Sequence, residues 1–233
     1  MSDVILDLFE DVEPIPQYEG GVAPIAPIPY PEHYVKVMGI FRAILAKEEV
    51  SKRAYLLTGE VIGLSEGNYT AWFYRRKMID LLQMSYQDEM DWLRGPTGLG
   101  LEKNYQIWHH RRCIAEVLGA KNDFEAEIDF LRKIFDSDCK NYHAWSYRIW
   151  LVERFSLWEG ELEYIEGLLD KEVTNNSAWS YRYFLLNRQP NNKSGTLDHV
   201  SNELKYLFTE RLPQDPFNEA AWVYLKGLYT IDD

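Results

Sequence analysis

The stretch that decides the fold reads KNYQIWHHRR and covers residues 103–112. It holds the asparagine Asn104, the tryptophan Trp108 four positions later, and the arginine Arg111 three positions after that. Asparagine is a preferred N-cap, because its side chain accepts hydrogen bonds from the open amides of the first helical turn. Residues three or four apart share one face of a helix. The stretch therefore predicts a helix that starts after Asn104 and buries Trp108.

The same pattern recurs along the chain with spacings of 34 to 43 residues. The tryptophans are Trp72, Trp108, Trp145, Trp179 and Trp222, and the asparagines four positions before them are Asn68, Asn104, Asn141, Asn175 and Asn218. Arginine follows the first four tryptophans by three positions, at Arg75, Arg111, Arg148 and Arg182, whereas the fifth copy has Leu225 there. A period near 35 is typical of a two-helix hairpin repeat. We expect these residues to be structural, with each tryptophan inside and each arginine spanning its edge.

From residue 34 onward, apolar residues recur at helical spacing, and no segment alternates as a strand does. We predict an all-α repeat domain over residues 34–233, built from about five to six stacked helical hairpins that form a curved solenoid. Acidic residues such as Glu89, Glu127 and Glu161 lie where the partner helices should start, and there they suit the positive end of the helix dipole. The glycines of residues 95–100 predict a break between helices.

Residues 1–33 have a different composition. Six of the 10 prolines lie here together with seven acidic residues, and no lysine or arginine precedes Lys36. Proline is excluded from helix interiors. We predict an extended, Pro-rich acidic arm, which is either disordered or lies along a surface through its few apolar side chains.

Charge and cysteine content exclude several classes of protein. The chain has 25 basic and 37 acidic residues, a formal charge of −12, which argues against a nucleic-acid surface and against binding to anionic membranes. Cys113 and Cys139 are the only cysteines, which excludes a disulfide framework and a Cys₄ zinc site. Neither a secretory signal nor a membrane span is visible. We expect a cytoplasmic protein.

Two copies of the repeat carry unusual residues at the helix start. Lys103 and Lys140 directly precede the cap asparagine, and the helices then begin with Tyr105 and Gln106 or with Tyr142 and His143. A lysine there faces the positive end of the helix dipole, at a cost of up to about 1 kcal/mol. Open amides, lysine, histidine and phenols together can bind a diphosphate or a carboxylate. Because hairpins stack, we expect these starts along one edge, about 10 Å apart. The alternative is two solvated lysines on loops.

The histidine pair in the same stretch does not indicate a metal site. His109 and His110 are adjacent, so they point to different faces of the helix, and a metal would need distant ligands. We therefore predict no metal site in this chain.

The repeat closely resembles the α subunit of protein farnesyltransferase, which is shared with protein geranylgeranyltransferase type I. The resemblance rests on residues 68–76, 103–112 and 140–145, on the later repeats around Trp179 and Trp222, and on residues 11–17 of the arm. It covers nearly the whole chain. Members of this family usually continue through further helices beyond the point that corresponds to Asp233.

The resemblance implies a right-handed α-α superhelix, shaped as a crescent around a β subunit. That partner would hold the catalytic Zn²⁺, and Mg²⁺ is expected for farnesyl transfer. The heterodimer would transfer a farnesyl or geranylgeranyl group from its diphosphate to the cysteine of a C-terminal CaaX motif. Alone, this chain would be inactive.

The resemblance also implies a role for individual residues. Lys103, His143 and Tyr142 match catalytic positions near the leaving group. Lys103, His143 and Tyr105 match positions that bind the diphosphate. Gln106 matches the position that binds the carboxylate of the CaaX peptide, and Tyr69 matches a position beside the peptide channel.

Two other functions remain open. One is the α subunit of the Rab-type geranylgeranyltransferase, which shares the tryptophan repeat but looks less similar around Lys103 and Lys140. The other is a non-catalytic helical-repeat scaffold that binds peptides.

Overall fold

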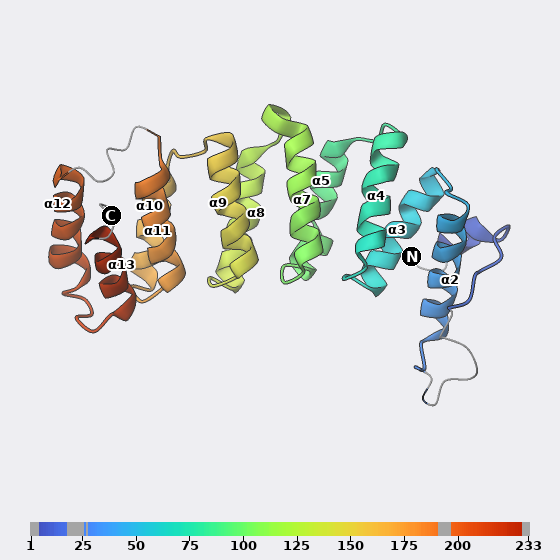
Figure 1. Ribbon diagram of the computed structural model, residues 1–233, viewed down its shortest axis with the longest axis horizontal. Coiled ribbons are helices and arrows are strands. Elements are labelled where there is room, and N and C mark those ends of the chain that lie inside the picture. The colour runs from blue at the N-terminus through green and yellow to red at the C-terminus, as the bar shows by residue number, and fades with distance from the viewer. Residues whose placement is uncertain (1–4, 18–25, 27, 191–196, 230–233) are drawn as a thin grey trace. The chain divides into compact units, whose positions relative to one another are not determined.

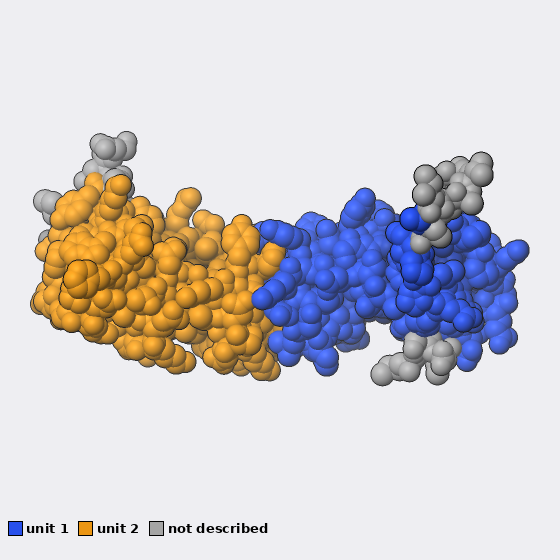
Figure 2. Space-filling model, turned by 90° about the horizontal axis from the view of Figure 1, so that it is seen from below, with its two compact units in different colours: residues 1–122 blue, residues 123–233 orange. Residues whose placement is uncertain are grey.

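The computed structural model describes residues 5–17, 26, 28–190 and 197–229. Within these ranges every regular element is a helix, and no strand occurs (Figure 1). The chain divides into two compact units, residues 1–122 and residues 123–233, which Figure 2 shows in different colours. The all-α prediction is confirmed.

The first unit consists of a short N-terminal turn followed by paired helices. Its elements are η1 (Asp7–Phe9), α2 (Glu32–Ala46), α3 (Lys52–Leu64), α4 (Tyr69–Leu81), α5 (Tyr86–Arg94), α6 (Pro96–Gly100), α7 (Tyr105–Leu118) and η2 (Gly119–Lys121). Helix α3 packs against α4, α5 packs against α7, and α4 lies beside α7 (Figure 1). The expected break is present, because α5 ends at Arg94 and the short helix α6 follows Gly95.

The second unit repeats the same arrangement. Its elements are α8 (Phe124–Ser137), α9 (Tyr142–Phe155), α10 (Glu161–Lys171), α11 (Asn176–Arg188), α12 (Leu197–Tyr206), the π-helical turn η3 (Leu207–Arg211) and α13 (Glu219–Tyr229). The contacts run from α8 to α9, from α10 to α11, and along the series α9, α11, α13. The second helices of successive hairpins are thus neighbours.

Each repeat asparagine caps the second helix of its hairpin. The Asn68 side chain accepts from the amide of Ala71 at 3.1 Å, and Asn141 does the same for Ala144 at 3.0 Å. Each repeat tryptophan also stabilises the turn before its helix, because its indole N–H donates to the backbone carbonyl six residues upstream. For Trp145 this acceptor is the Cys139 carbonyl, at 2.9 Å. Five helix starts are fixed in this way.

The tryptophan rings also join one hairpin to the next. Trp145 packs on Tyr181 with ring centroids 5.2 Å apart, and Trp179 packs on Tyr224 at 5.1 Å. In the first unit, Trp72 packs on His110 at 5.1 Å. In each case the second ring lies two residues after the following tryptophan of the repeat. A continuous core therefore runs from hairpin to hairpin within each unit.

The repeat arginines Arg75, Arg148 and Arg182 are buried as ion pairs with glutamates of the next hairpin. Arg75 binds Glu89, and Arg182 binds Glu203, each through two hydrogen bonds. The guanidinium groups also stack on aromatic rings, as Arg75 does 3.9 Å from the centre of Trp92. Glu89 and Glu161 lie in the first turns of α5 and α10, as the sequence predicts, and they are also buried partners of repeat arginines.

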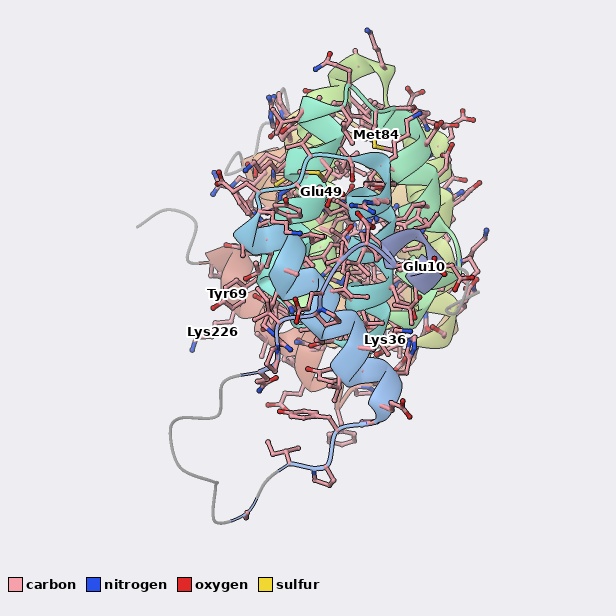
Figure 3. The ribbon with its side chains drawn as sticks, turned by 90° about the vertical axis from the view of Figure 1, so that its right-hand side faces the viewer. Glu10, Lys36, Glu49, Tyr69, Met84 and Lys226 are labelled. Atoms are coloured by element: carbon pink, nitrogen blue, oxygen red, sulfur yellow. The ribbon has the colours of Figure 1, made fainter. Side chains whose placement is uncertain are left out.

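The opening segment, which the sequence predicts to be an arm, is held against α2 and α3 over residues 5–17 (Figure 3). Leu6, Phe9 and Val12 are buried, and Arg53 of α3 pairs with Asp11 at 2.6 Å. A side chain at Gly39 of α2 would approach the Pro14 side chain to 2.8 Å, so the close passage of this segment requires glycine there.

Candidate functional site

Three exposed tyrosines begin the second helices of three hairpins. Tyr69 starts α4, Tyr105 starts α7 and Tyr142 starts α9, and their exposed fractions are 71%, 70% and 69%. Each follows a cap asparagine and is the first residue of its helix, where its side chain is exposed. Figure 3 shows Tyr69 at the outer edge of the packed helices. The helix starts of α4, α7 and α9 thus present phenolic hydroxyls to ligands.

In the first unit, the predicted residues gather at the start of α7. Lys103 is exposed and directly precedes the cap Asn104, whose side chain accepts from the amide of Gln106 at 2.7 Å. Gln106 is half-buried, one residue after Tyr105. Since α4 lies beside α7, the site residue Tyr69 belongs to the neighbouring helix of the same unit (Figure 1). An ammonium group, a phenol and an amide therefore stand at one helix terminus, which favours an anionic ligand.

In the second unit, Tyr142 and His143 are the first two residues of α9. The rings of Tyr142 and His143 lie edge to face with centroids 5.6 Å apart. His143 is half-buried, and this desolvation lowers its pKa. The neutral imidazole is therefore favoured at neutral pH, and it can offer a ligand a hydrogen bond rather than a full positive charge.

Lys140 forms an exposed ion pair with Glu172. Its ammonium group lies 3.0 Å from the carboxylate of Glu172, and that hydrogen bond raises the pKa of Lys140. The pair is exposed, so it is weakly held and an anionic ligand can compete for the lysine. Lys140 and Tyr142 also line a groove of about 450 Å³ between α9 and α11, together with Ser177 and Ser180.

Sequence reasoning missed a buried polar cluster beside the start of α7. His110 is fully buried, and its Nε2 lies 2.6 Å from Oε1 of Glu89. Burial lowers the pKa of His110 despite this carboxylate. Burial alone would raise the pKa of Glu89, but hydrogen bonds from His110 and Arg75 and the charge of Arg75 lower it to about 2. One feature of the sequence could have indicated this cluster. The residue two positions after each repeat tryptophan is tyrosine in four copies and histidine only at His110.

The described part of the chain contains neither a group of metal-ligating side chains nor a membrane-spanning helix. Its His, Cys, Asp and Glu side chains form no group of three suited to a metal ion. No helix in the same ranges is long and apolar enough to cross a membrane.

The sequence and the geometry match one family of proteins. The family profile described as "Protein prenyltransferase alpha subunit repeat" matches residues 124–155 and 158–189. The chain is 36% identical over 210 residues to the protein farnesyltransferase/geranylgeranyltransferase type-1 subunit alpha of Candida albicans, an alignment that covers 88% of this chain and 68% of that protein. The chain belongs to this family of α subunits. The predicted resemblance is confirmed.

Other members of the α-subunit family show the same likeness. The Arabidopsis thaliana subunit is 39% identical over 257 residues, covering 96% of this chain and 67% of the relative. An alignment with the Schizosaccharomyces pombe subunit is shorter, with 38% identity over 125 residues and 41% of that relative covered. The chain thus spans from about two fifths to two thirds of the length of these α subunits. The type-2 subunit of Candida albicans is less similar, at 29% over 125 residues.

A solved structure shares the α-subunit fold. The protein described as "Candida albicans protein geranylgeranyltransferase-I complexed with GGPP" contains a chain that matches with a TM-score of 0.83 and 36% identity. The match covers 94% of this chain and 73% of that chain. It confirms the predicted prenyltransferase α-subunit fold of helical hairpins.

Proposed function

We propose that this α-subunit family member acts in a heterodimeric CaaX protein prenyltransferase. With a β subunit, it would transfer a farnesyl or geranylgeranyl group from the diphosphate to the cysteine thiol of a C-terminal CaaX motif. The observation that carries the proposal is the match to a geranylgeranyltransferase-I chain whose structure includes GGPP. The names of the relatives in three organisms support it.

Lys103 and Tyr105 have the chemistry to stabilise the leaving diphosphate. Negative charge builds on the diphosphate oxygens as the bond to the isoprenoid breaks. An ammonium group and a phenolic O–H fixed at a helix start interact more strongly with that charge in the transition state than in the ground state. Both side chains are exposed at the start of α7.

His143 and Tyr142 would serve the same leaving group from α9. The neutral imidazole favoured at His143 acts as a hydrogen-bond donor, and the exposed Tyr142 hydroxyl acts as a second. Gln106 and Tyr69 would bind the peptide, since an amide N–H₂ donates to a terminal carboxylate and a phenol can pack along the peptide chain.

The remaining chemistry would come from the partner. Zn²⁺ in the β subunit would bind the peptide cysteine as a thiolate, and Mg²⁺ would accompany the diphosphate during farnesyl transfer. The cytoplasmic location predicted from the sequence belongs to the same proposal.

Co-expression with a candidate β subunit tests this function. The purified pair is assayed with farnesyl and geranylgeranyl diphosphate in parallel, with a CaaX peptide as acceptor and the same peptide with serine in place of cysteine as control. We expect transfer only when both chains and the cysteine are present. Transfer that requires an additional escort protein would favour the Rab-type enzyme instead. A stable monomer that binds peptide without transfer would favour the scaffold.

A further inference from the structure

The ring that follows each repeat tryptophan by two residues differs in one copy. It is tyrosine in four copies, at Tyr74, Tyr147, Tyr181 and Tyr224, and histidine at His110. The tyrosines hold one acceptor each: the Tyr147 hydroxyl donates to Glu127 at 2.8 Å, and the Tyr224 hydroxyl donates to Glu203 at 2.7 Å. A phenol has a single polar atom, at the end of its ring.

His110 uses two polar atoms on different edges of its ring. Its Nε2 lies 2.6 Å from Oε1 of Glu89 on α5, and its Nδ1 lies 3.3 Å from Nη1 of Arg76 on α4. A guanidinium only donates, so Nδ1 must accept and carry no proton. Nε2 then carries the proton and donates it to the Glu89 carboxylate. The contacts therefore define one neutral tautomer that bridges α4, α5 and α7.

The helices that His110 joins carry the two residues assigned to the peptide. Gln106 lies one turn before His110 on α7, and Tyr69 lies about two turns before Arg76 on α4. Lys103 and Tyr105, by contrast, both belong to the start of α7, so a movement between α4 and α7 leaves their spacing unchanged.

We propose that His110 is a positioning residue for the peptide substrate, which sets α7 against α4 through Arg76 and so fixes Gln106 relative to Tyr69. This inference rests on the proposed function. His110 touches neither substrate in this role and acts through the helices that it joins.

The surroundings of His110 allow it little freedom. It is fully buried against the ring of Trp72, and Glu89 is buried as well. The charged groups that face it are Glu89 from α5 and Arg75 and Arg76 from α4. A buried polar network whose hydrogen bonds are all made rigidifies the elements that it joins, here α4, α5 and α7.

Three variants remove the Arg76 bridge from either side. His110→Tyr installs the residue that the other copies use and keeps a donor for Glu89. His110→Leu removes both ring nitrogens with a smaller side chain, in case the phenol does not fit. Arg76→Met removes the donor to Nδ1 and keeps an apolar stem. Lys77→Met is the matched control, since it removes one positive charge from the same turn of α4.

The variants are assayed as heterodimers for the KM of peptide and of isoprenoid diphosphate. We expect His110→Tyr, His110→Leu and Arg76→Met to raise the peptide KM about tenfold, in the range of small misplacements of binding groups. The KM for diphosphate should stay within about twofold, and Lys77→Met should match wild type. The double variant His110→Tyr/Arg76→Met should be no worse than either single variant, because both remove one bond. An unchanged peptide KM in folded variants would overturn the proposal, and so would additive losses.

A second readout needs no turnover. Two-bond ¹H–¹⁵N spectra of histidine-labelled protein report which ring nitrogen carries the proton. We expect His110 as the Nε2–H tautomer near pH 7.5 in wild type and a weakened preference in Arg76→Met. The Nδ1–H tautomer or an imidazolium would refute the bridge. If the heterodimer shows no transfer while the tautomer is as expected, the proposed function fails and the bridge stands.

Discussion

Arg148 on α9 and Glu161 on α10 are joined by two parallel hydrogen bonds inside the second unit. Nε of Arg148 donates to Oε2 of Glu161 at 2.8 Å, and Nη2 donates to Oε1 at 2.7 Å. Both side chains are buried. Tyr181 of α11 donates to the same carboxylate. One glutamate therefore links three helices that belong to two hairpins.

Removing the Glu161 charge should destabilise the protein strongly. Glu161→Ala leaves Arg148 buried without its carboxylate, and we expect a loss of about 3–5 kcal/mol in the free energy of unfolding, measured by urea denaturation. Asp129→Asn is the control, because it breaks an exposed arginine–aspartate pair with Arg132 and should change stability by less than about 1 kcal/mol. Equal losses in the two variants would contradict a special role for the buried pair.

The hydrogen bond that caps α9 at Asn141 should contribute measurably to the free energy of unfolding. Asn141→Ala removes the acceptor for the Ala144 amide, and we expect a loss of about 1–2 kcal/mol in urea denaturation. Asn141→Asp keeps a side-chain oxygen in the same place and adds a favourable charge at the helix start, so it should recover most of that loss. If the aspartate variant were as unstable as the alanine variant, capping would not be the reason.

Lys103→Ala should slow prenyl transfer in the assembled enzyme. Loss of one charge-stabilising donor typically lowers the rate by about ten- to a thousand-fold, and single-turnover assays isolate that step. Lys103→Arg should recover part of the rate, since it restores a positive charge. Lys36→Ala changes an exposed lysine on α2 and should leave the rate unchanged. A normal rate in Lys103→Ala would remove this lysine from the leaving-group site.

Acidification should weaken the first unit in two successive steps. The pKa of His110 is lowered in the folded state, so the unfolded chain binds a proton first, and stability falls as the pH drops below about 6.5. The pKa of Glu89 falls from 4.5 to about 2, so its contribution is present above pH 4.5 and is lost between 4.5 and about 2.

The groups that face His110, namely Glu89, Arg75 and Arg76, set the size of the first step. The slope for one proton is at most about 1.4 kcal/mol per pH unit. Urea midpoints measured from pH 8 to pH 5 should therefore decline less steeply in His110→Gln than in wild type. His109 and His143 also have lowered pKa values and remain in both proteins, so the difference between the two curves reports His110. Identical slopes would show that the His110 environment does not resist protonation.

The sequence predicts well what depends on neighbouring positions. Asparagine caps and buried tryptophans follow from spacings of three and four residues within one helix. The partners of the repeat arginines were missed, because Arg75 and Glu89 lie 14 residues apart across a hairpin connection. His110 was considered only as a metal ligand and dismissed, since nothing local shows that Glu89 and Arg76 converge on it from two other helices.

The sharing of each buried glutamate between consecutive hairpins has an evolutionary consequence. Glu89 accepts hydrogen bonds from Arg75, which precedes it in the sequence, and from His110, which follows it. Glu203 accepts in the same way from Arg182 and from Tyr224. A hairpin gained or lost by duplication would keep every carboxylate supplied with donors, because each copy brings one of each kind. Point changes have no such protection, so substitutions should covary both between adjacent hairpins, as at Arg75 and Glu89, and within one hairpin, as at Glu89 and His110.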